Sequence, residues 1–457
     1  MKSENSAMNI CGALGLLEKK NEFEFAWLYG ENFHLHEHAI KNERTTFLFF
    51  YKIITHFLKL IKLIKLQKKA NLETDVVFFA ASKNQADSLI SIHNDLVGGE
   101  LKSKFIVTNK KLSKLMGNSR KVQLLNLTIS DFINISVTSI LRFPYLFYYL
   151  FRNGLLNRKI LANFDVYLLC HTYIFLFYRV FLACKPKIIV LSNDHNSENR
   201  VLAYLAKKHE IKVCYVQHAS VSPIFPPLNQ FDYAFLDGLN SYDVYKKVSP
   251  GIGECSVRLT GIQNKSAIKL NSASQRKVVV QNIGVSISLL DSFERVETLI
   301  ESMSDYKILI RLHPQQDQLF KRKLNGLLTR KVNVSLDSSE SQHEYFSCLD
   351  VHLAGESGIH LEALLFGLCS YHVEFEKDKE NYDYYGFLKS GLITTFEKSV
   401  LKGNCNLTAK QIESIKTFSA TYRTKWESIE HQLVAKYLLL ILKNGRLESN
   451  ENNSFTL

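Results

Sequence analysis

The feature that most limits the fold of this chain is a repeated unit of short apolar strand, polar turn and helix. In the first half, each β-rich apolar run is followed by a polar cluster and then by residues with helical periodicity. The clearest runs are 75–81 (DVVFFAA), 187–192 (KIIVLS) and 212–217 (KVCYVQ). Strands that alternate with helices at this spacing predict a parallel sheet with crossover helices.

The same pattern restarts after a segment at 250–264 that holds one proline and three glycines. Runs at 277–283 (KVVVQNI), 306–311 (YKILIR) and 351–354 (VHLA) predict a second sheet. The sequence therefore predicts an α/β protein with two Rossmann-like domains that face each other across a cleft. Ligands of open α/β sheets bind outside the carboxyl ends of the strands, so the residues that follow each strand are the candidates for a site.

The charge of the chain favours anionic partners. It carries 57 Lys and Arg residues against 44 Asp and Glu residues, a net charge of +13. Phosphorylated small molecules and anionic lipids fit such a surplus. No basic block is long enough for a nucleic-acid-binding arm, so no nucleic-acid partner is expected. A protein that uses its basic charge only for solubility is the alternative.

Several features indicate a cytoplasmic protein. The eight cysteines contain no C-x-x-C pair and several lie in apolar runs, which indicates reduced, buried thiols. The first twenty residues lack the apolar core of a signal peptide. No run of about 18 uncharged apolar residues occurs, so no spanning helix is predicted.

The segment 46–69 predicts a basic amphipathic helix. Its apolar residues recur with helical spacing, and Lys52, Lys59 and Lys62 fall close together on a helical wheel. Such a helix can lie on an anionic membrane surface, which would place the protein peripherally on the inner membrane. A helix packed on its own domain, with its lysines in water, explains the pattern equally well.

Residues with a possible role in anion binding end the strand at 306–311. Arg311 is the last residue of that run, and Pro314 biases His313 towards an extended conformation at the lip of the sheet. An imidazole at this place can donate a hydrogen bond to a phosphate oxygen or a leaving group. The alternative is a surface histidine before a turn.

A second set follows the strand at 351–354. Ser357 and Gly358 lie where a helix is predicted to begin. Backbone N–H groups and the helix dipole make such a terminus an anion site, and small residues let a phosphate approach. Ser357 can equally be a plain helix cap. Glu362, about one turn further, can reach a ribose hydroxyl or face solvent.

The first half offers two candidate general bases. His218 follows the strand at 212–217 and precedes a proline-rich loop, and Asp194 follows the neighbouring strand at 187–192. Either side chain can take the proton of an acceptor hydroxyl. His218 can instead pack under the proline-rich loop, and the sequence leaves the choice between His218 and Asp194 open.

Four segments carry a resemblance to a known group of enzymes. They are VQHASVSPIFPPL (216–228), FDYAFLDG (231–238), RLHP (311–314) and AGESGIHLEALLFG (354–367). They resemble bacterial capsule and lipopolysaccharide transferases with a GT-B fold. That group includes CDP-glycerol glycerophosphotransferase-like enzymes and bacterial sialyl- and polysialyltransferases. The sequence departs from the glycerophosphotransferase pattern at Ala219, where a glycine is usual.

The resemblance implies a division of labour between the domains. Over about residues 75–390, which it covers, it implies an acceptor domain at 71–260 and a donor-nucleotide domain at 261–400. The sequence itself predicts a polar segment with a basic amphipathic helix at 1–70, and C-terminal helices with a polar tail at 401–457. The resemblance implies that His218 is the catalytic base, and Asp194 stays the alternative from its place after a strand. The residues that would bind the donor's nucleotide and phosphates are Arg311, His313, Pro314, Ser357, Gly358 and Glu362.

The activity that the resemblance implies is inverting, metal-independent transfer in capsule or lipopolysaccharide synthesis. A sugar or polyol phosphate would move from a CMP-, CDP- or UDP-linked donor to a polysaccharide or lipid-linked acceptor, with no cofactor. Two other hypotheses stay open: a hydrolysing sugar-nucleotide epimerase, and a non-enzymatic basic protein on a membrane. The histidines at His34, His36 and His38 lack a second cluster of ligands, so no metal site is predicted there.

Overall fold

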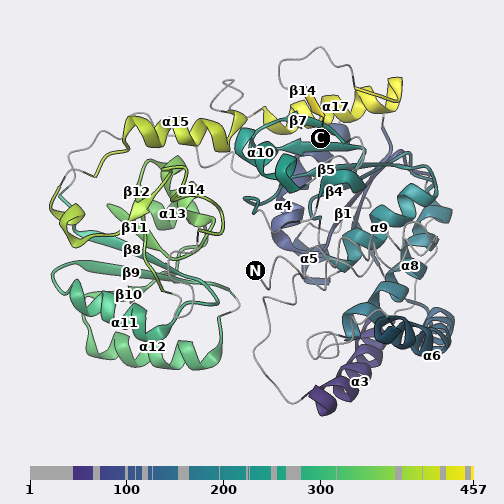
Figure 1. Ribbon diagram of the computed structural model, residues 1–457, viewed down its shortest axis with the longest axis horizontal. Coiled ribbons are helices and arrows are strands. Elements are labelled where there is room, and N and C mark those ends of the chain that lie inside the picture. The colour runs from purple at the N-terminus through teal and green to yellow at the C-terminus, as the bar shows by residue number, and fades with distance from the viewer. Residues whose placement is uncertain are drawn as a thin grey trace.

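The computed structural model contains two α/β domains, drawn side by side in Figure 1. One is built on an eight-stranded sheet and the other on a six-stranded sheet. The predicted fold class, two Rossmann-like α/β domains, is confirmed. The structure describes residues 45–64, 73–97, 101–108, 110–115, 122–125, 127–152, 164–194, 196–222, 225, 227–248, 255–263, 279–314, 316–375, 383–403, 405–421, 429–447 and 454–456.

The first sheet is parallel except for its last strand. Its order is β14-β7-β6-β5-β4-β1-β2-β3, and only β14 runs antiparallel to its neighbour. Strands β1 and β4 are buried at every position rather than at alternate ones, because helices cover both faces. The strands are β1 (Val76–Ala80), β2 (Ser103–Val107), β3 (Val122–Leu124), β4 (Ile188–Leu191), β5 (Lys212–Val216), β6 (Tyr233–Leu236), β7 (Ser256–Leu259) and β14 (Ser454–Thr456).

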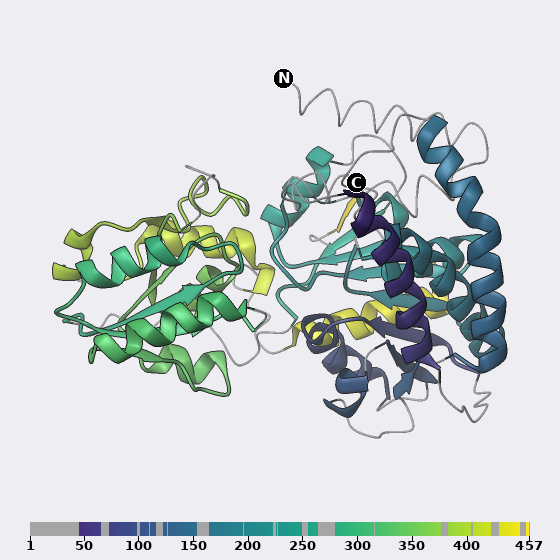
Figure 2. The ribbon, with the colours of Figure 1, turned by 90° about the horizontal axis from the view of Figure 1, so that it is seen from below.

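Two layers of helix cover one face of this sheet. Phe177 of α8 meets Phe79 of β1 with ring centroids 5.2 Å apart, and α3 and α6 pack outside α8 (Figure 2). On the other face, α4 is a neighbour of the C-terminal helix α17. The helices of this domain are α3 (Thr45–Leu63), α4 (Lys83–Val97), α5 (Lys110–Leu115), α6 (Ile129–Arg152), α8 (Phe164–Cys184), α9 (Ser197–Lys208), η1 (Leu228–Gln230), α10 (Leu239–Val248) and α17 (Glu430–Asn444).

The second sheet is parallel throughout, in the order β10-β9-β8-β11-β12-β13. Its strands are β8 (Asn282–Ile287), β9 (Lys307–Leu312), β10 (Val334–Leu336), β11 (Val351–Ala354), β12 (Cys369–His372) and β13 (Thr394–Thr395). Helices α11 (Phe293–Ser302) and α12 (Gln318–Arg330) pack on one core, with η2 (Lys398–Lys402). Helices α13 (Gln342–Ser347), α14 (Ile359–Phe366) and α15 (Ala409–Phe418) pack on the other.

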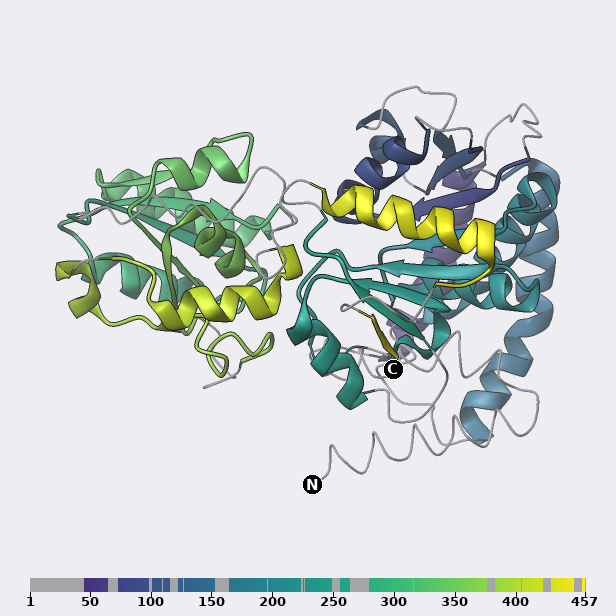
Figure 3. The same ribbon diagram turned by 90° about the horizontal axis from the view of Figure 1, so that it is seen from above.

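The chain returns to the first domain after α15. Gly238, which follows β6, has no room for a side chain, because a Cβ there would lie 2.6 Å from the carbonyl oxygen of Thr417. The N–H of Ala420 donates to the carbonyl of Asp237 at 2.7 Å. Helix α17 then packs on the first domain, where Tyr437 stacks on Phe235 at 5.9 Å (Figure 3). The end of α15 is thus held against the end of β6.

Two expectations from the sequence need correction. The strand expected at 277–283 starts at Asn282 and runs to Ile287, since Val279 is exposed whereas residues 283–287 are all buried. Cys348 is exposed, while the other described cysteines are buried as expected. Among the described helices, none is both long and apolar enough to cross a membrane.

Candidate functional site

His313 and Ser357 follow two strands that flank the same central strand. β9 and β11 both pair with β8, in registers that align Leu312 with Ile287 and Ala354 with Ser286. Neighbouring strands lie about 4.8 Å apart, so the two strand ends are roughly 10 Å apart across the sheet. That spacing allows two side chains to approach one diphosphate from opposite sides.

The backbone of His313 is fixed on both sides. Its N–H donates to the carbonyl of Ile287 at 3.0 Å, and its own carbonyl accepts from the N–H of Gln316 at 2.9 Å. The imidazole is half-buried, and burial lowers its pKa below the usual value, so the ring is neutral at neutral pH. Pro314 is exposed beside it. The position therefore offers a neutral N–H donor at the strand end.

Arg311 is engaged inside its own domain. Its guanidinium pairs with the carboxylate of Asp337, donates to Ser339 Oγ at 3.1 Å and lies over the ring of Tyr345 at 5.1 Å. These contacts hold the end of β9 to the segment after β10. They give Arg311 a structural role in this arrangement.

The turn at 355–358 leads from β11 into α14. Gly358 is the N-cap residue of that helix, and Ser357 Oγ accepts from the N–H of Ile359 at 3.4 Å. A Cβ at Gly355 would come within 3.0 Å of a carboxylate oxygen of Asp291, so the turn runs very close to the end of β8. Small side chains and the first N–H groups of α14 give this turn the features of an anion site.

Glu362 lies in the first turn of α14 and is buried. The expectation that it could face solvent is therefore wrong.

A buried chain of hydrogen bonds lies beneath this turn. Tyr345 Oη is 3.4 Å from Ser286 Oγ, which is 2.9 Å from His352 Nε2. Ser370 Oγ lies between the two histidines, 2.8 Å from His352 Nδ1 and 2.6 Å from His360 Nδ1. His360 Nε2 is 2.9 Å from the carbonyl oxygen of Gly355. We call this series, from Tyr345 to the Gly355 carbonyl, the buried hydrogen-bond chain.

The donor and acceptor of each hydrogen bond in this chain follow from the group at its end, the Gly355 carbonyl. The Gly355 carbonyl can only accept, so His360 Nε2 carries a proton. Burial lowers the pKa of His360 to about 4, and burial with the nearby His360 lowers the pKa of His352 well below its usual value. Both rings are therefore neutral. Ser370 must then donate to His360 Nδ1 and accept from His352 Nδ1–H, and the same logic makes Ser286 donate to His352 Nε2.

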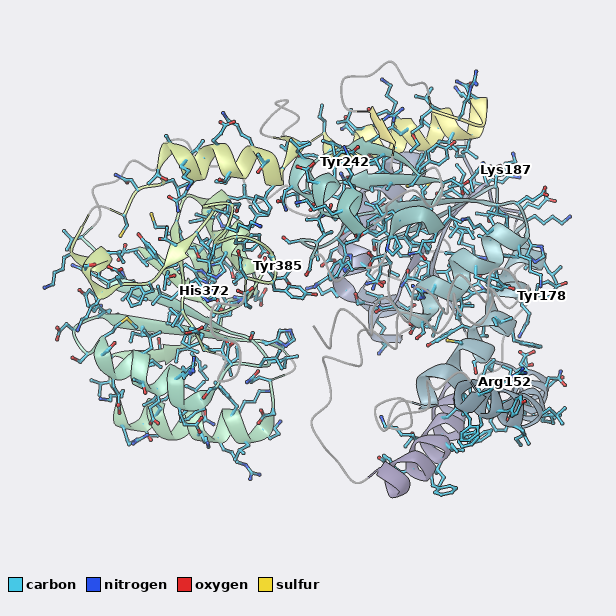
Figure 4. The ribbon with its side chains drawn as sticks, in the orientation of Figure 1. Arg152, Tyr178, Lys187, Tyr242, His372 and Tyr385 are labelled. Atoms are coloured by element: carbon cyan, nitrogen blue, oxygen red, sulfur yellow. The ribbon has the colours of Figure 1, made fainter. Side chains whose placement is uncertain are left out.

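The turn is also connected to the first domain. A carboxylate oxygen of Glu356 accepts from the N–H of Tyr384 at 3.0 Å, and its other oxygen is 3.9 Å from His372 Nδ1. The ring of Tyr384 meets that of Phe225 edge-on, 6.2 Å between centroids. Figure 4 shows the next residue, Tyr385, at the side of the second domain that faces the first. The loop after β5 therefore contacts the segment of Tyr384, which follows β12 and is bonded to the turn after β11.

In the first domain, His218 lies on a turn that the side chain of Gln217 fixes by hydrogen bonds. Gln217 Nε2 donates to the carbonyl of Ala219 at 2.8 Å, and its Oε1 accepts from the N–H of Asp237 at 2.9 Å. The side chain of Gln217 thus ties the end of β5 to the end of β6. His218 itself is half-buried between these fixed neighbours.

Asp194 is placed differently from His218. It is buried, and the hydroxyl of Tyr245 donates to its carboxylate at 2.8 Å. Tyr245 in turn lies 3.3 Å from the hydroxyl of Tyr215, and Gln230 Nε2 donates to the Asp194 carbonyl at 3.2 Å. The carboxylate is thus enclosed by protein groups, whereas His218 reaches the surface of the strand end.

The sequence did not single out the buried hydrogen-bond chain. Ser370 lies on β12. This strand was not predicted, because polar and apolar residues alternate in its sequence, CSYH. His352 and His360 looked like members of a strand and a helix, and nothing in the sequence places them 5.8 Å apart. The signal in the sequence is an isolated polar residue inside otherwise apolar segments, such as His352 in VHLA.

The structure adds no candidate metal site in the part of the chain that it describes, where no three His, Cys, Asp or Glu side chains gather to hold an ion. The alternating histidines His34, His36 and His38 lie outside the described residues.

The fold has known counterparts. The calicheamicin glycosyltransferase superposes with a TM-score of 0.50 and 9% identity over 81% of this chain and 99% of its own. The UDP-GlcNAc 2-epimerase from Neisseria meningitidis, bound to UDP-GlcNAc, gives 0.48 and 13% over 80% and 99%. The wall teichoic acid polymerase TagF gives 0.43 and 13% over 88% and 99%. No family model matches the sequence, and no curated protein matches it.

These comparisons show a GT-B fold, since two parallel Rossmann-like sheets are matched over nearly the whole length of a GT-B glycosyltransferase. At 9% identity the likeness concerns the fold and not the activity.

Proposed function

We propose that the protein is a cytoplasmic transferase that moves a sugar or polyol phosphate from a CMP-, CDP- or UDP-linked donor to a cell-surface polysaccharide or its lipid-linked precursor. The observation that carries the proposal is that two candidate phosphate-binding residues follow the strands on either side of β8 in the second domain. His313 and Ser357 flank β8. Ser357 also stands on a turn whose Gly355 carbonyl is held by the buried hydrogen-bond chain.

The donor's phosphates fit this arrangement on chemical grounds. The neutral imidazole of His313 donates an N–H to a phosphate oxygen, and Ser357 donates its hydroxyl from the other side. The N-terminal N–H groups of α14 add partial positive charge at the same place. As the donor bond breaks, these donors stabilise the charge that develops on the departing phosphate, so the proposal needs no metal ion.

The acceptor side is assigned to the first domain. The acceptor hydroxyl attacks the carbon or phosphorus that is transferred, a bond to the leaving phosphate breaks, and the hydroxyl proton passes to a base. We assign that base to His218, because its imidazole is only half-buried and stands on a turn fixed by Gln217. Asp194 is buried against Tyr245, so we assign it to holding the end of β4.

The contact between Phe225 and Tyr384 supports one shared site. Phe225 belongs to the loop that follows His218. Tyr384 is tied to Glu356, the neighbour of Ser357. The loop of His218 and the turn of Ser357 are thus linked through Tyr384.

A donor screen tests the proposal. The purified protein is incubated with CMP-, CDP- and UDP-linked donors and a mixture of polysaccharide and lipid-linked acceptors, and release of free nucleotide is measured. We expect release that requires an acceptor and falls at least ten-fold in His313→Ala. The matched control is His343→Ala, an exposed histidine of the same domain, which should retain activity.

Three outcomes would count against it. Interconversion of a sugar nucleotide without acceptor would decide for an epimerase. Failure to bind any nucleotide would leave the basic membrane protein as the better description. Equal loss in His313→Ala and His343→Ala would remove His313 from the site.

A further inference from the structure

Helix α3 exposes a stripe of large apolar side chains. Phe50, Tyr51, Ile54, Leu58 and Ile61 are each more than half exposed. At 3.6 residues per turn they fall within an arc of about 100°. The opposite side of the helix, with His56 and Leu60, is buried against the domain. The stripe is therefore additional to the face that α3 uses for packing.

Helix α6 repeats this arrangement along its full length. Its exposed apolar residues run from Ile129 through Ile133 and Ile140 to Tyr148 and Phe151. They occupy an arc of about 120° at the same helical period. The buried face of α6 lies opposite, at Asp131, Ile135 and Ser139. Because α3 and α6 pack beside each other outside α8, the two stripes belong to the same side of the domain (Figures 1 and 2).

The second domain provides a contrast. Its exposed large apolar side chains, such as Leu319 and Val332, stand on separate elements. Scattered apolar residues of this kind are normal on a soluble surface. A continuous stripe over two long helices is not, and such patches mark interaction sites.

The charges beside the stripes are of one sign. The two helices contain five basic residues in their sequences, Lys52, Lys59, Lys62, Arg142 and Arg152. The single acid among their described residues is Asp131, which is buried and paired with Arg179. On the helical wheel the position of Lys62 lies about 20° beyond the exposed stripe of α3, and that of Arg152 lies about 20° beyond that of α6. The positions of Lys52 and Lys59 lie about 80–100° from the stripe of α3. Arg152 lies on α6 on the side away from the second domain (Figure 4).

We propose that the exposed stripes of α3 and α6, together the outer face, lie on an anionic membrane surface. The stripes run from Phe50 to Ile61 and from Ile129 to Phe151, roughly 17 and 33 Å at 1.5 Å per residue. Among the described residues of the two helices, the charges next to the stripes are positive. An apolar face with a basic border is the pattern of helices that lie in the interface of a bilayer with anionic lipids. The inference is independent of the transferase activity.

Vesicle binding tests the outer face. The full-length protein is sedimented with vesicles of phosphatidylcholine alone, and with vesicles in which about one third of the lipid is the anionic phosphatidylglycerol. We expect binding to the anionic vesicles that weakens with salt. The double variant Ile54→Glu, Ile133→Glu should lose at least ten-fold in partitioning, because both side chains are exposed and the changes do not disturb the core. The matched control is Leu319→Glu, Val332→Glu, two exposed residues of the second domain, which should bind as the parent does.

Sedimentation velocity of the same proteins tests whether a second copy of this chain, rather than a membrane, covers the outer face. A parent that dimerises, and a double variant that is monomeric, would assign the face to a second copy of this chain and overturn the proposal. Vesicle binding that is equal in the parent and the double variant would overturn it as well, as would a parent that does not bind anionic vesicles. Nucleotide binding in solution is measured alongside and should be the same in all variants, which keeps this test separate from that of the transferase.

Discussion

The strand ends of the two domains differ in how firmly hydrogen bonds within the protein fix the candidate site residues. In the second domain, the turn at 355–358 rests on a buried hydrogen-bond chain in which two imidazoles and two serines are paired in series. In the first domain, the enclosed acid Asp194 is bonded to Tyr245. The group nearest the surface is the half-buried His218, on a turn shaped by Gln217.

This difference suits the second domain to binding the donor and the first domain to the chemical step. A rigid turn with fixed donors binds the donor's phosphates before the reaction and keeps them bound as charge develops on the leaving phosphate. An imidazole at a strand end, whose proton can come and go, suits a step that occurs only during the reaction. We therefore expect substitutions in the second domain to change donor affinity and stability, and substitutions in the first domain to change the rate.

The largest effect is expected at His218. With His218→Ala, kcat should fall by about 10²–10⁴, the usual contribution of a general base. Donor affinity, measured by calorimetry, should stay within about two-fold, since the second domain is untouched. A loss of donor affinity as large as the loss in kcat would move His218 to the donor site and break the comparison.

Acid should weaken the second domain before the first. His360 has a pKa of about 4 in the folded protein, below the ordinary value, because it is buried. The unfolded chain therefore binds a proton first as the pH falls, so stability is present above pH ~6.5 and is lost towards pH ~4, by on the order of 3 kcal/mol. Hydrogen exchange, corrected for the intrinsic pH dependence of the exchange rate, should show lower protection in β11 and α14 at pH ~5 than at pH ~7. An equal loss of protection in β1 and β4 would contradict this.

Removal of the His313 imidazole, which we propose binds the donor's phosphates, should change the affinity for the donor. His313→Ala is expected to weaken nucleotide diphosphate binding by about 10- to 100-fold, the range for one hydrogen bond to a charged group. The free energy of unfolding should change little, because the side chain is half-buried and its backbone bonds persist. If binding is unchanged while kcat falls, His313 contributes to the reaction rather than to donor binding.

Ser370→Ala tests the buried hydrogen-bond chain directly. The change leaves Nδ1 of both His352 and His360 without the serine hydroxyl, so unfolding should become easier by about 1–3 kcal/mol. The donor KM should rise a few-fold while kcat is retained, since the turn loses its support but no reacting group is removed. Ser335→Ala, an exposed serine of β10, is the control and should match the parent.

The smallest effect is expected at Asp194. In Asp194→Asn the amide oxygen can still accept from the Tyr245 hydroxyl, so the fold should be kept. We expect kcat within about ten-fold of the parent, far less than the loss in His218→Ala. A loss in Asp194→Asn that equals or exceeds that in His218→Ala would reverse the assignment of the base.

Much of the fold could be predicted because it rests on local apolar runs. The strands that end before His313 and before Gly355 were expected where they occur, since YKILIR and VHLA are short, mostly apolar segments. Strand β12 was missed because CSYH alternates polar and apolar residues and is only four residues long. Strand β8 was placed too early because Gly284 and Ser286 interrupt its apolar character.

The partners of the site residues could not be predicted. Arg311 looked available for a donor, but its ion pair with Asp337 depends on how the ends of β9 and β10 meet. Asp194 and His218 looked equivalent until the buried hydroxyl of Tyr245, 51 residues away, was seen on the carboxylate. Such contacts depend on tertiary packing, which no spacing along the chain records.

The central claim is that His313 and Ser357 bind one pair of phosphates, and a crystal structure with a bound nucleotide diphosphate tests it most directly. The account predicts phosphate oxygens within hydrogen-bond distance of the His313 imidazole and the Ser357 hydroxyl, above the start of α14. Phosphates bound elsewhere on the protein, with both side chains directed away from them, would contradict it.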